Sequence, residues 1–278
     1  MIEKMKMVCV VSSVSRKDEM LDGLRSLGLL HLAEKKNPDR AVAERFTTLS
    51  KTAATLTDYA PDKNGKNKET VPVLSDSEFE EMYQNVLSAL EKKSSLEQEI
   101  SAANAEIERI KAWGKFSPED VKRVREDGYD LHFYRLGKNE YQMALQDPEI
   151  KMIALTPVDK MHTVAVLGTL PVTIPAAEFT LPEKGIDALT AQIEHCQTEI
   201  GTCEETLKKS SIYDASFQVQ MLKAQNAENY SSASETAESD ENFVWISGYL
   251  PESDLPKFKA AATEHKWAWA MDDVSEDD

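Results

Sequence analysis

Residues 78–110 read EFEEMYQNVLSALEKKSSLEQEISAANAEIERI, and their apolar side chains recur at alternating intervals of three and four residues. Residues 186–224 read IDALTAQIEHCQTEIGTCEETLKKSSIYDASFQVQMLKA and keep the same spacing. A seven-residue repeat sustained this long is typical of a coiled-coil seam and not of an ordinary globular helix. We therefore predict an outbound and a return helix that pack antiparallel, with a compact segment between them.

Each helix supplies two seam positions. The outbound positions are Phe79, Val86, Lys93, Ile100 and Ile107, and Met82, Ala89, Leu96, Ala103 and Ile110. The return positions are Ile186, Ile193, Ile200, Leu207, Asp214 and Met221, and Leu189, Cys196, Cys203, Ser210, Phe217 and Ala224. Antiparallel pairing predicts Ile107 and Ile110 near Ile186, Leu189 or Ile193, and Phe79 and Met82 near Phe217 or Met221.

Two charged residues interrupt the seam. A charge at a core position costs stability but can fix the register of a coiled coil or mark a bend. Lys93 can extend its ammonium group to solvent, so it can also be a merely tolerated residue. Asp214 lies where SSIYDASF departs from strong heptads. It predicts a loosening of the coil near the proximal end.

Both ends of the chain read as β-α-β units. Residues 4–14 contain the β-branched run MVCVVSSV, a helical pattern follows, and Gly28 provides a stop before LLHLA. Near the other end, FVWISGYL precedes a helical pattern and then KWAWAM. Neither unit buries a sheet alone, so we predict that they combine into one ferredoxin-like lobe. Its predicted core is Val8, Val10, Leu24, Leu30, Leu32, Val244, Ile246 and Phe258.

The fold class predicted from these patterns is α+β, a dumbbell of two small α/β lobes joined by a long antiparallel coiled coil. We expect helix caps at Asp76 or Ser77, a polar loop at about 60–75, and a distal lobe punctuated by prolines. The predicted domains are residues 1–36 and 242–278 for the proximal ferredoxin-like lobe, 37–115 for the outbound helices, 116–182 for the distal lobe, 183–229 for the return helix and 230–241 for an acidic linker.

Composition narrows the functional classes. The chain has 278 residues and a formal net charge of −17. Nucleic-acid binding requires clustered Lys and Arg, so nucleic acid is not an expected partner. The acidic excess favours a basic or amphipathic partner, or it only keeps an extended protein in solution. We expect a chain without signal peptide or membrane span that resides in the cytoplasm, because no apolar run approaches the roughly 20 residues that cross a bilayer.

The residues that usually carry chemistry do not form a recognisable site. The sequence contains no phosphate-binding loop, no HExxH and no G-x-S-x-G. Cys196 and Cys203 are seven residues apart on one helix, about 10 Å in rise, too far for a disulfide between them. Cys9 and the five histidines (His31, His132, His162, His195 and His265) are scattered. We therefore predict no catalytic, cofactor-binding or metal-binding residues and no cofactor, hence a protein that is not an enzyme.

The two ends also carry a family resemblance. MIEKMKMVCVVSSVSRKDEMLDGLRSLGLLHLAE, residues 1–34, resembles the start of subunit I of the bacterial and archaeal V/A-type rotary ATPases, which is related to eukaryotic subunit a. FVWISGYLPESDLPKFKAAATEHKWAWAMDDVSEDD, residues 243–278, is similar to the strand-helix-strand that precedes the membrane half of that family. Trp113-Gly114 followed by Phe116-Ser117 fits the start of its distal lobe. Tyr249 stands where a Trp is common.

The resemblance implies a non-catalytic stator subunit of an ion-translocating rotary ATPase, at the cytoplasmic face of the membrane. It implies that peripheral-stalk E/G-type heterodimers bind both lobes, with the central-stalk cap subunit as a further candidate partner. In the family, a membrane half contacts the rotor ring and forms the ion path. The chain ends at Asp278 where that half is expected to begin, which fits either an excised domain or a natural truncation.

A second functional class stays open. A ferredoxin-like lobe can bind small molecules at its strand edges, so the alternative is a ligand-sensing module tethered by a coiled coil. Neither the choice between proton and sodium coupling nor that between ATP synthesis and hydrolysis follows from the sequence.

Overall fold

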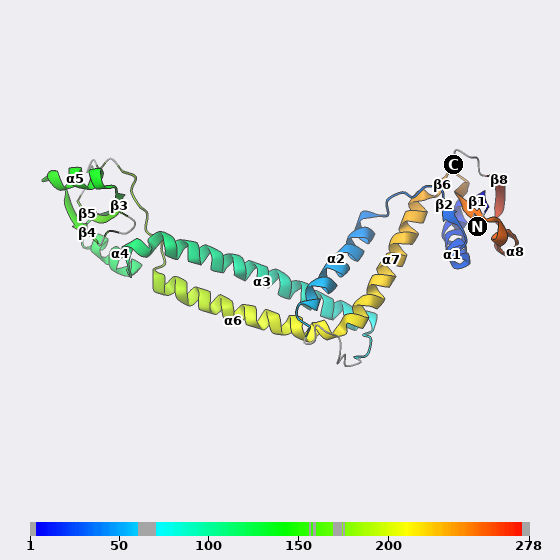
Figure 1. Cartoon of the computed structure of the whole chain (residues 1–278), viewed down its shortest axis with the longest axis horizontal. Helices are drawn as coiled ribbons and strands as arrows, with labels where there is room; N and C mark the ends of the chain where they lie inside the picture. Colours follow the sequence, from blue (N-terminus) through cyan, green and yellow to red (C-terminus); the bar gives the residue numbers. More distant parts are fainter. Residues whose placement is uncertain are drawn as a thin grey trace. The chain divides into compact units, whose positions relative to one another are not determined.

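The computed structural model describes residues 4–60, 71–155, 157, 160–168, 174 and 176–273. This part of the chain combines long helices with two small antiparallel sheets, so the protein belongs to the α+β class (Figure 1). It divides into two units, Met1–Glu80 with Ser210–Asp278, and Glu81–Lys209. Most of the predicted loop at 60–75 lies outside the described residues, as do the prolines at 171 and 175.

The sheet of the first unit joins the two ends of the chain. Strand β1 (Met5–Ser13) pairs antiparallel with β7 (Phe243–Pro251) on one side and with β8 (Ala268–Asp273) on the other. β2 (His31–Leu32) and the short β6 (Glu238–Ser239) both pair with β7. The path of the sheet is therefore β2-β7-β1-β8, with neighbouring strands antiparallel.

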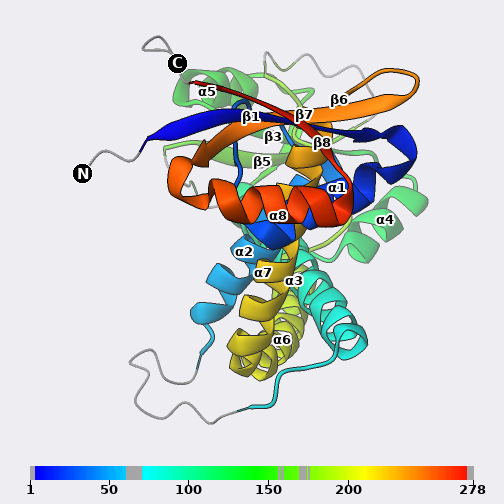
Figure 2. The ribbon, with the colours of Figure 1, turned by 90° about the vertical axis from the view of Figure 1, so that its right-hand side faces the viewer.

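Two helices cover one face of this sheet. α1 (Lys17–Leu27) and α8 (Leu255–His265) lie on the same side of the strands (Figure 2). Gly28 ends α1 with a left-handed φ of 65°, as predicted. The buried cluster beneath the helices contains Val8, Val10, Leu24, Val244, Ile246 and Phe258, with Leu30 and Leu32 packed against it. Six of the eight predicted core residues thus belong to the buried cluster, and the other two pack against it.

A pair of antiparallel helices completes the first unit. α2 (Arg40–Thr57) lies beside α7 (Asp214–Thr236). At one end the Asp39 amide donates to Ser231 Oγ at 2.8 Å, and at the other the Ser211 hydroxyl donates to the Tyr59 carbonyl at 3.4 Å. These contacts show that the two helices run in opposite directions.

The prediction of a single return helix followed by a linker at 230–241 is wrong. The return segment consists of α6 (Ile186–Ser210), a 3-10 turn at Ser211–Tyr213, and α7, which continues to Thr236. The turn precedes Asp214, where loosening was predicted. The serine-rich end of α7 stays helical because the lobe satisfies its polar groups: Ser232 Oγ donates to the Lys36 carbonyl at 2.6 Å.

The second unit contains the main antiparallel seam. Most of α3 (Asp76–Ile110) belongs to it, and its side chains contact those of α6. Ile110 and Leu189 share a buried cluster, against which Ile107, Ile186 and Ile193 pack. In the first unit, the rings of Phe79 and Phe217 meet edge to face at 5.0 Å. The predicted antiparallel register is confirmed at both places.

The start of α3 differs slightly from the prediction. Ser75 is the capping residue, not Asp76 or Ser77: its hydroxyl accepts from the Glu78 amide at 3.4 Å. The Glu78 carboxylate accepts from the Ser75 amide at 2.9 Å in return. This reciprocal arrangement is a capping box, and the acids at 76 and 78 also favour the helix start.

A three-stranded sheet forms the lobe of the second unit. Its order is β3 (Leu131–Leu136), β5 (His162–Leu167) and β4 (Lys151–Ala154), with both pairings antiparallel. α4 (Pro118–Glu126) leads into β3, and α5 (Lys138–Gln146) connects β3 with β4. α5 was not predicted from the sequence, because its nine residues are mostly polar.

Ion pairs accompany the apolar seam of the second unit. Lys93 is 18% exposed and bonds to Glu204 Oε1 at 2.9 Å across the helix pair. The neighbouring Lys92 bonds to Glu199. These hydrogen bonds and the lysine charges lower the pKa of the Glu204 and Glu199 carboxyls. A charged seam residue therefore has a defined partner on the facing helix.

Truncating Phe217 tests the packing of the first unit. Phe217 and Phe79 are each 1% exposed, so Phe217→Ala leaves a cavity in a close-packed site. We expect the free energy of unfolding, measured in urea, to fall by about 3–5 kcal/mol. Leu222→Ala on the same helix is the control, since Leu222 is 60% exposed and should cost less than about 0.5 kcal/mol. Equal effects would contradict the register.

The ion pairs predict an acid-sensitive stability. A carboxyl whose folded pKa is depressed stabilises the fold above its unfolded pKa, and this contribution disappears as the pH falls through the folded pKa. We expect the free energy of unfolding to fall as the pH is lowered from 6 to 3. The fall should be smaller for the double variant Glu199→Gln/Glu204→Gln than for the parent chain. Glu205→Gln, on the same helix, should follow the parent. Parallel curves for all three proteins would show that the pairs contribute nothing measurable.

Candidate functional site

The distal lobe of the second unit is attached to its helices by aromatic packing. Trp113, just beyond α3, meets the Phe133 ring edge to face at 5.2 Å and lies 5.2 Å from the Phe179 ring. The Arg109 guanidinium lies 4.5 Å from the Phe179 centroid and also donates to the Thr180 carbonyl at 3.0 Å. These contacts fix segment 178–183 beside strand β3.

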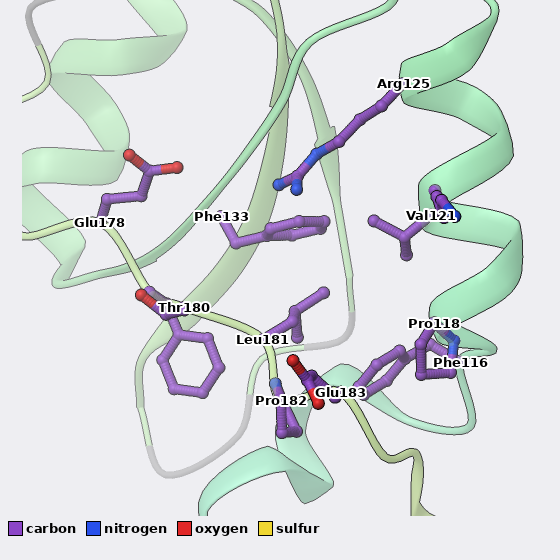
Figure 3. Close-up of a pocket in the computed structure, with 12 residues that line it drawn as sticks. Phe116, Pro118, Val121, Arg125, Phe133, Glu178, Thr180, Leu181, Pro182 and Glu183 are labelled. Carbon is purple, nitrogen blue, oxygen red and sulfur yellow. The ribbon is translucent and has the colours of Figure 1, made fainter.

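A cavity opens between this segment and α4. Its volume is about 260 Å³, and its lining includes Phe116, Val121, Phe133, Leu181 and Arg125. Figure 3 shows Val121 and Arg125 extending from α4 toward Phe133, which comes from the sheet. The apolar side chains give the cavity a hydrophobic wall of the kind that receives an apolar anchor residue of a partner.

Charged groups of both signs surround this wall. Arg125 donates to the Leu131 carbonyl at 3.4 Å, and Lys122 also lines the cavity. On the other side Glu178 bonds to His132 Nδ1 at 2.8 Å. Burial, with the nearby Glu178 charge, raises the pKa of the Tyr134 hydroxyl, so this phenol is neutral at physiological pH. The cavity therefore has an apolar wall with charged groups of both signs at its margin.

The backbone at Gly185, two residues after segment 178–183, lies very close to the backbone of Phe116 at the base of the lobe. A Cβ atom built at Gly185 would lie 2.5 Å from the Phe116 carbonyl oxygen, closer than real Cβ contacts. The Leu189 amide, in the first turn of α6, donates to the Gly185 carbonyl at 3.0 Å. Gly185 therefore allows the chain to pass from the lobe into α6 while touching the start of α4.

The first unit offers a second surface, on the sheet face opposite α1 and α8. Side chains alternate across a strand, so Val8 and Val10 face the core while Cys9 and Val11 face the other way. Cys9 and Val11 are half-buried, as is Trp245, which stands opposite Val11 in β7. The Trp245 indole donates to Glu238 at 3.0 Å. This face is apolar enough to receive a partner.

Cys196 and two of the histidines, His162 and His265, are engaged in packing. The Cys196 thiol contacts Glu99 at 3.8 Å, and burial together with that carboxylate raises its pKa. His162 stacks on Tyr141, and His265 stacks on Trp267, which precedes β8 and is buried. Among the described residues, no group of three or more His, Cys, Asp or Glu side chains is placed to hold a metal ion.

The cavity and the open sheet face were not identified from the sequence, which predicted no site residues. The local signals were Ser117-Pro118 at the start of α4 and Pro182 directly after Leu181. Both mark chain turns, but the cavity itself depends on tertiary packing of Trp113 with Phe133 and Phe179. No helix in the part of the chain that the structure describes is long and apolar enough to cross a membrane.

Comparisons with known proteins return one functional description. The chain is 26% identical over 298 aligned positions to V-type ATP synthase subunit I 1 of Treponema pallidum, and 20% identical over 292 to V-type ATP synthase subunit I of Borreliella burgdorferi. Both alignments cover the whole chain but only 47% and 45% of the relatives. The chain thus spans about half the length of the curated relatives it matches.

A solved structure gives a related description. It is the cytoplasmic N-terminal domain of subunit I, homolog of subunit a, of V-ATPase, at 13% identity and a TM-score of 0.39, with 96% of this chain and 100% of that chain covered. No family model matches the chain. The sequence similarity over the full chain confirms the resemblance to V-type ATPase subunit I inferred from the two ends.

Substitution of Gly185 tests the junction at the candidate site. Gly185→Ala must displace the Phe116 backbone, so we expect a lower unfolding temperature and weaker protection of 178–183 against hydrogen exchange. Gly201→Ala is the matched control because nothing lies within 4 Å of its added Cβ. It should stabilise α6 by about 0.5–1 kcal/mol, since Ala has the higher helix propensity. We therefore expect Gly185→Ala to destabilise the protein and Gly201→Ala to stabilise it. Stabilisation by both substitutions would contradict the close approach at Gly185.

Proposed function

We propose that the chain is the cytoplasmic stator arm of a V/A-type rotary ATPase. The carrying observation is the similarity over the whole chain to two V-type ATP synthase subunit I proteins, each matched over about half its own length. The proposal includes the dumbbell arrangement of two lobes and the ferredoxin-like nature of the lobe with strand order β2-β7-β1-β8. It also places the protein at the cytoplasmic face of the membrane, as a subunit that performs no catalysis itself.

The physical reason is torque. A rotary motor needs its catalytic head held against the turning shaft, and two separated attachments resist rotation better than one. Each structural unit combines a small sheet lobe with helices that contact each other, α2 with α7 in the first and α3 with α6 in the second. Long helix pairs carry load along their axes through continuous backbone hydrogen bonds. They offer narrow seams that are already occupied, whereas the lobes offer broader surfaces.

We propose that a peripheral-stalk E/G-type heterodimer binds each lobe. In the second unit the binding surface is the cavity beside α4, where Val121 and Leu181 would receive an apolar anchor. In the first unit it is the open sheet face around Val11 and Trp245. Each interface would be of modest size, under about 1,600 Å². The central-stalk cap subunit remains a further candidate partner, and in a full-length form a membrane half would contact the rotor ring.

The alternative, a ligand-sensing module, has one observation in its favour. A cavity lies beside β2, the edge strand of the first unit, where small molecules are expected to bind such a lobe. The two functions differ in their partner: a stator requires stalk subunits, whereas a sensor binds its ligand without them.

The test is capture of co-expressed E- and G-type stalk subunits by the full chain carrying single substitutions. Val121→Asp places a charge in the distal cavity, and Val11→Glu places one on the open sheet face. We expect each to weaken capture at least fivefold, and the double variant to abolish it, because the two attachments contribute additively. Circular dichroism confirms that each variant is folded.

Matched controls use exposed apolar residues elsewhere on the same lobes. Met143→Asp lies on α5, where Met143 is 62% exposed, and Met271→Glu lies on β8, where Met271 is 42% exposed. Both should capture stalk subunits as the parent does. Loss of capture only with Val11→Glu would mean that the distal lobe has another partner, and full capture by the double variant would reject stalk binding at these surfaces.

A further inference from the structure

A cavity of about 600 Å³ lies in the first unit, between three elements. α1 contributes Leu24 and Arg25, the segment Gly28–Lys35 with strand β2 contributes a second wall, and α7 contributes Asn226 and Asn229. A volume of this order is within the range of sites that bind small molecules. The cavity thus lies where the helix pair joins the sheet lobe.

Its charge differs from that of the rest of the chain. The formal net charge of the protein is −17, yet the described residues that line this cavity include Arg25 and Lys35 and no Asp or Glu. Neither of these two side chains has an ion-pair partner among the described residues. An unpaired cationic lining in an acidic protein favours an anionic occupant.

A neighbouring cavity of similar volume provides a comparison. It shares Arg25, Asn226 and Tyr230 with the first but adds Asp22, Glu235 and Lys223 to its lining, so its formal charges balance. The excess of positive charge is therefore a property of the cavity beside β2 and not of its neighbour.

The remaining lining has both polar and apolar parts. Asn226 and Asn229 carry amide groups, which can donate hydrogen bonds to oxygen atoms. Leu24 and Ile246 belong to the buried core of the lobe, and Leu30 packs against it. A ligand with an anionic group and an apolar portion would match both parts of this lining.

We propose that this cavity binds a small organic anion with an apolar portion, a phosphate monoester in preference to a monocarboxylate. Arg25 and Lys35 carry permanent positive charges at neutral pH, which suits a group with two negative charges. Guanidinium and ammonium groups form their strongest hydrogen bonds with such oxygen atoms. The proposal goes beyond the stator function and requires no stalk subunit.

Binding there would affect the joint between α7 and the lobe. Direct hydrogen bonds already cross this joint: among them, Tyr230 donates to Asp18 at 2.9 Å, and Lys17 donates to the Ser234 carbonyl at 2.9 Å. Burial and the Asp18 contact raise the pKa of Tyr230 to about 12, so its hydroxyl remains a donor. A ligand in contact with α1, β2 and α7 would add a further link and reduce the opening of this joint.

The experiment measures binding of octyl phosphate to the full chain by titration calorimetry. Inorganic phosphate and octyl glucoside test the anionic and apolar parts separately, and octanoate tests the preference for a dianion. We expect saturable binding of octyl phosphate, about tenfold weaker binding of octanoate and phosphate, and none of octyl glucoside. Hydrogen exchange at 226–236 should slow when octyl phosphate is bound.

Arg25→Gln/Lys35→Gln should weaken octyl phosphate binding at least tenfold, whereas Lys51→Gln, an exposed lysine on α2, should leave it unchanged. Flotation with phosphatidic acid vesicles separates a free ligand from a lipid headgroup. Binding only to vesicles, binding that the double variant does not weaken, or an absence of saturable binding would each overturn the proposal. None of these outcomes depends on stalk capture, so the stator proposal is judged separately.

Discussion

The pairing of β1 with β7 is the constraint on which the first unit depends. Residues 5–13 align with residues 251–243, so the sheet closes only after nearly the whole chain has been made. Closing so long a loop costs entropy, although this cost rises only slowly with length. Within this unit, the contact of Asp39 with Ser231 shows that the start of α2 and the end of α7 lie together, where the chain leaves and re-enters the lobe. Packing of α2 with α7 and pairing of β1 with β7 therefore stabilise each other.

The same constraint explains which features the sequence could predict. The strands at both ends show the alternation expected of a half-buried sheet, at Val8 and Val10 and at Val244 and Ile246. The β-α-β unit at each end is too small to bury a sheet alone, which indicated that the two units combine. The heptads predicted the antiparallel pairing of Phe79 with Phe217, because a regular apolar spacing fixes which faces of two helices pack together. These are properties of local periodicity, which a sequence displays directly.

Features that arise from tertiary contacts were harder to predict from the sequence. Residues 230–236 look like a linker because they are rich in serine, yet they form the end of α7 because the lobe supplies partners such as Lys36 and Asp18. The cavity beside α4 depends on Trp113, whose position is fixed by rings far away in sequence. The cationic cavity beside β2 joins Arg25 and Asn229, which no motif connects. A surface of this kind has no signature in the linear order of residues.

The edge strand β8 has a consequence for behaviour at high concentration. All of its residues are exposed, and its outer edge presents backbone groups that could pair with another chain. Asp272 and Asp273 end this strand. Lys6 on β1 forms an ion pair with Asp273. Two copies approaching edge to edge would bring these carboxylates together, and the mutual repulsion would oppose strand addition. The acidity of this strand thus acts as protection against aggregation.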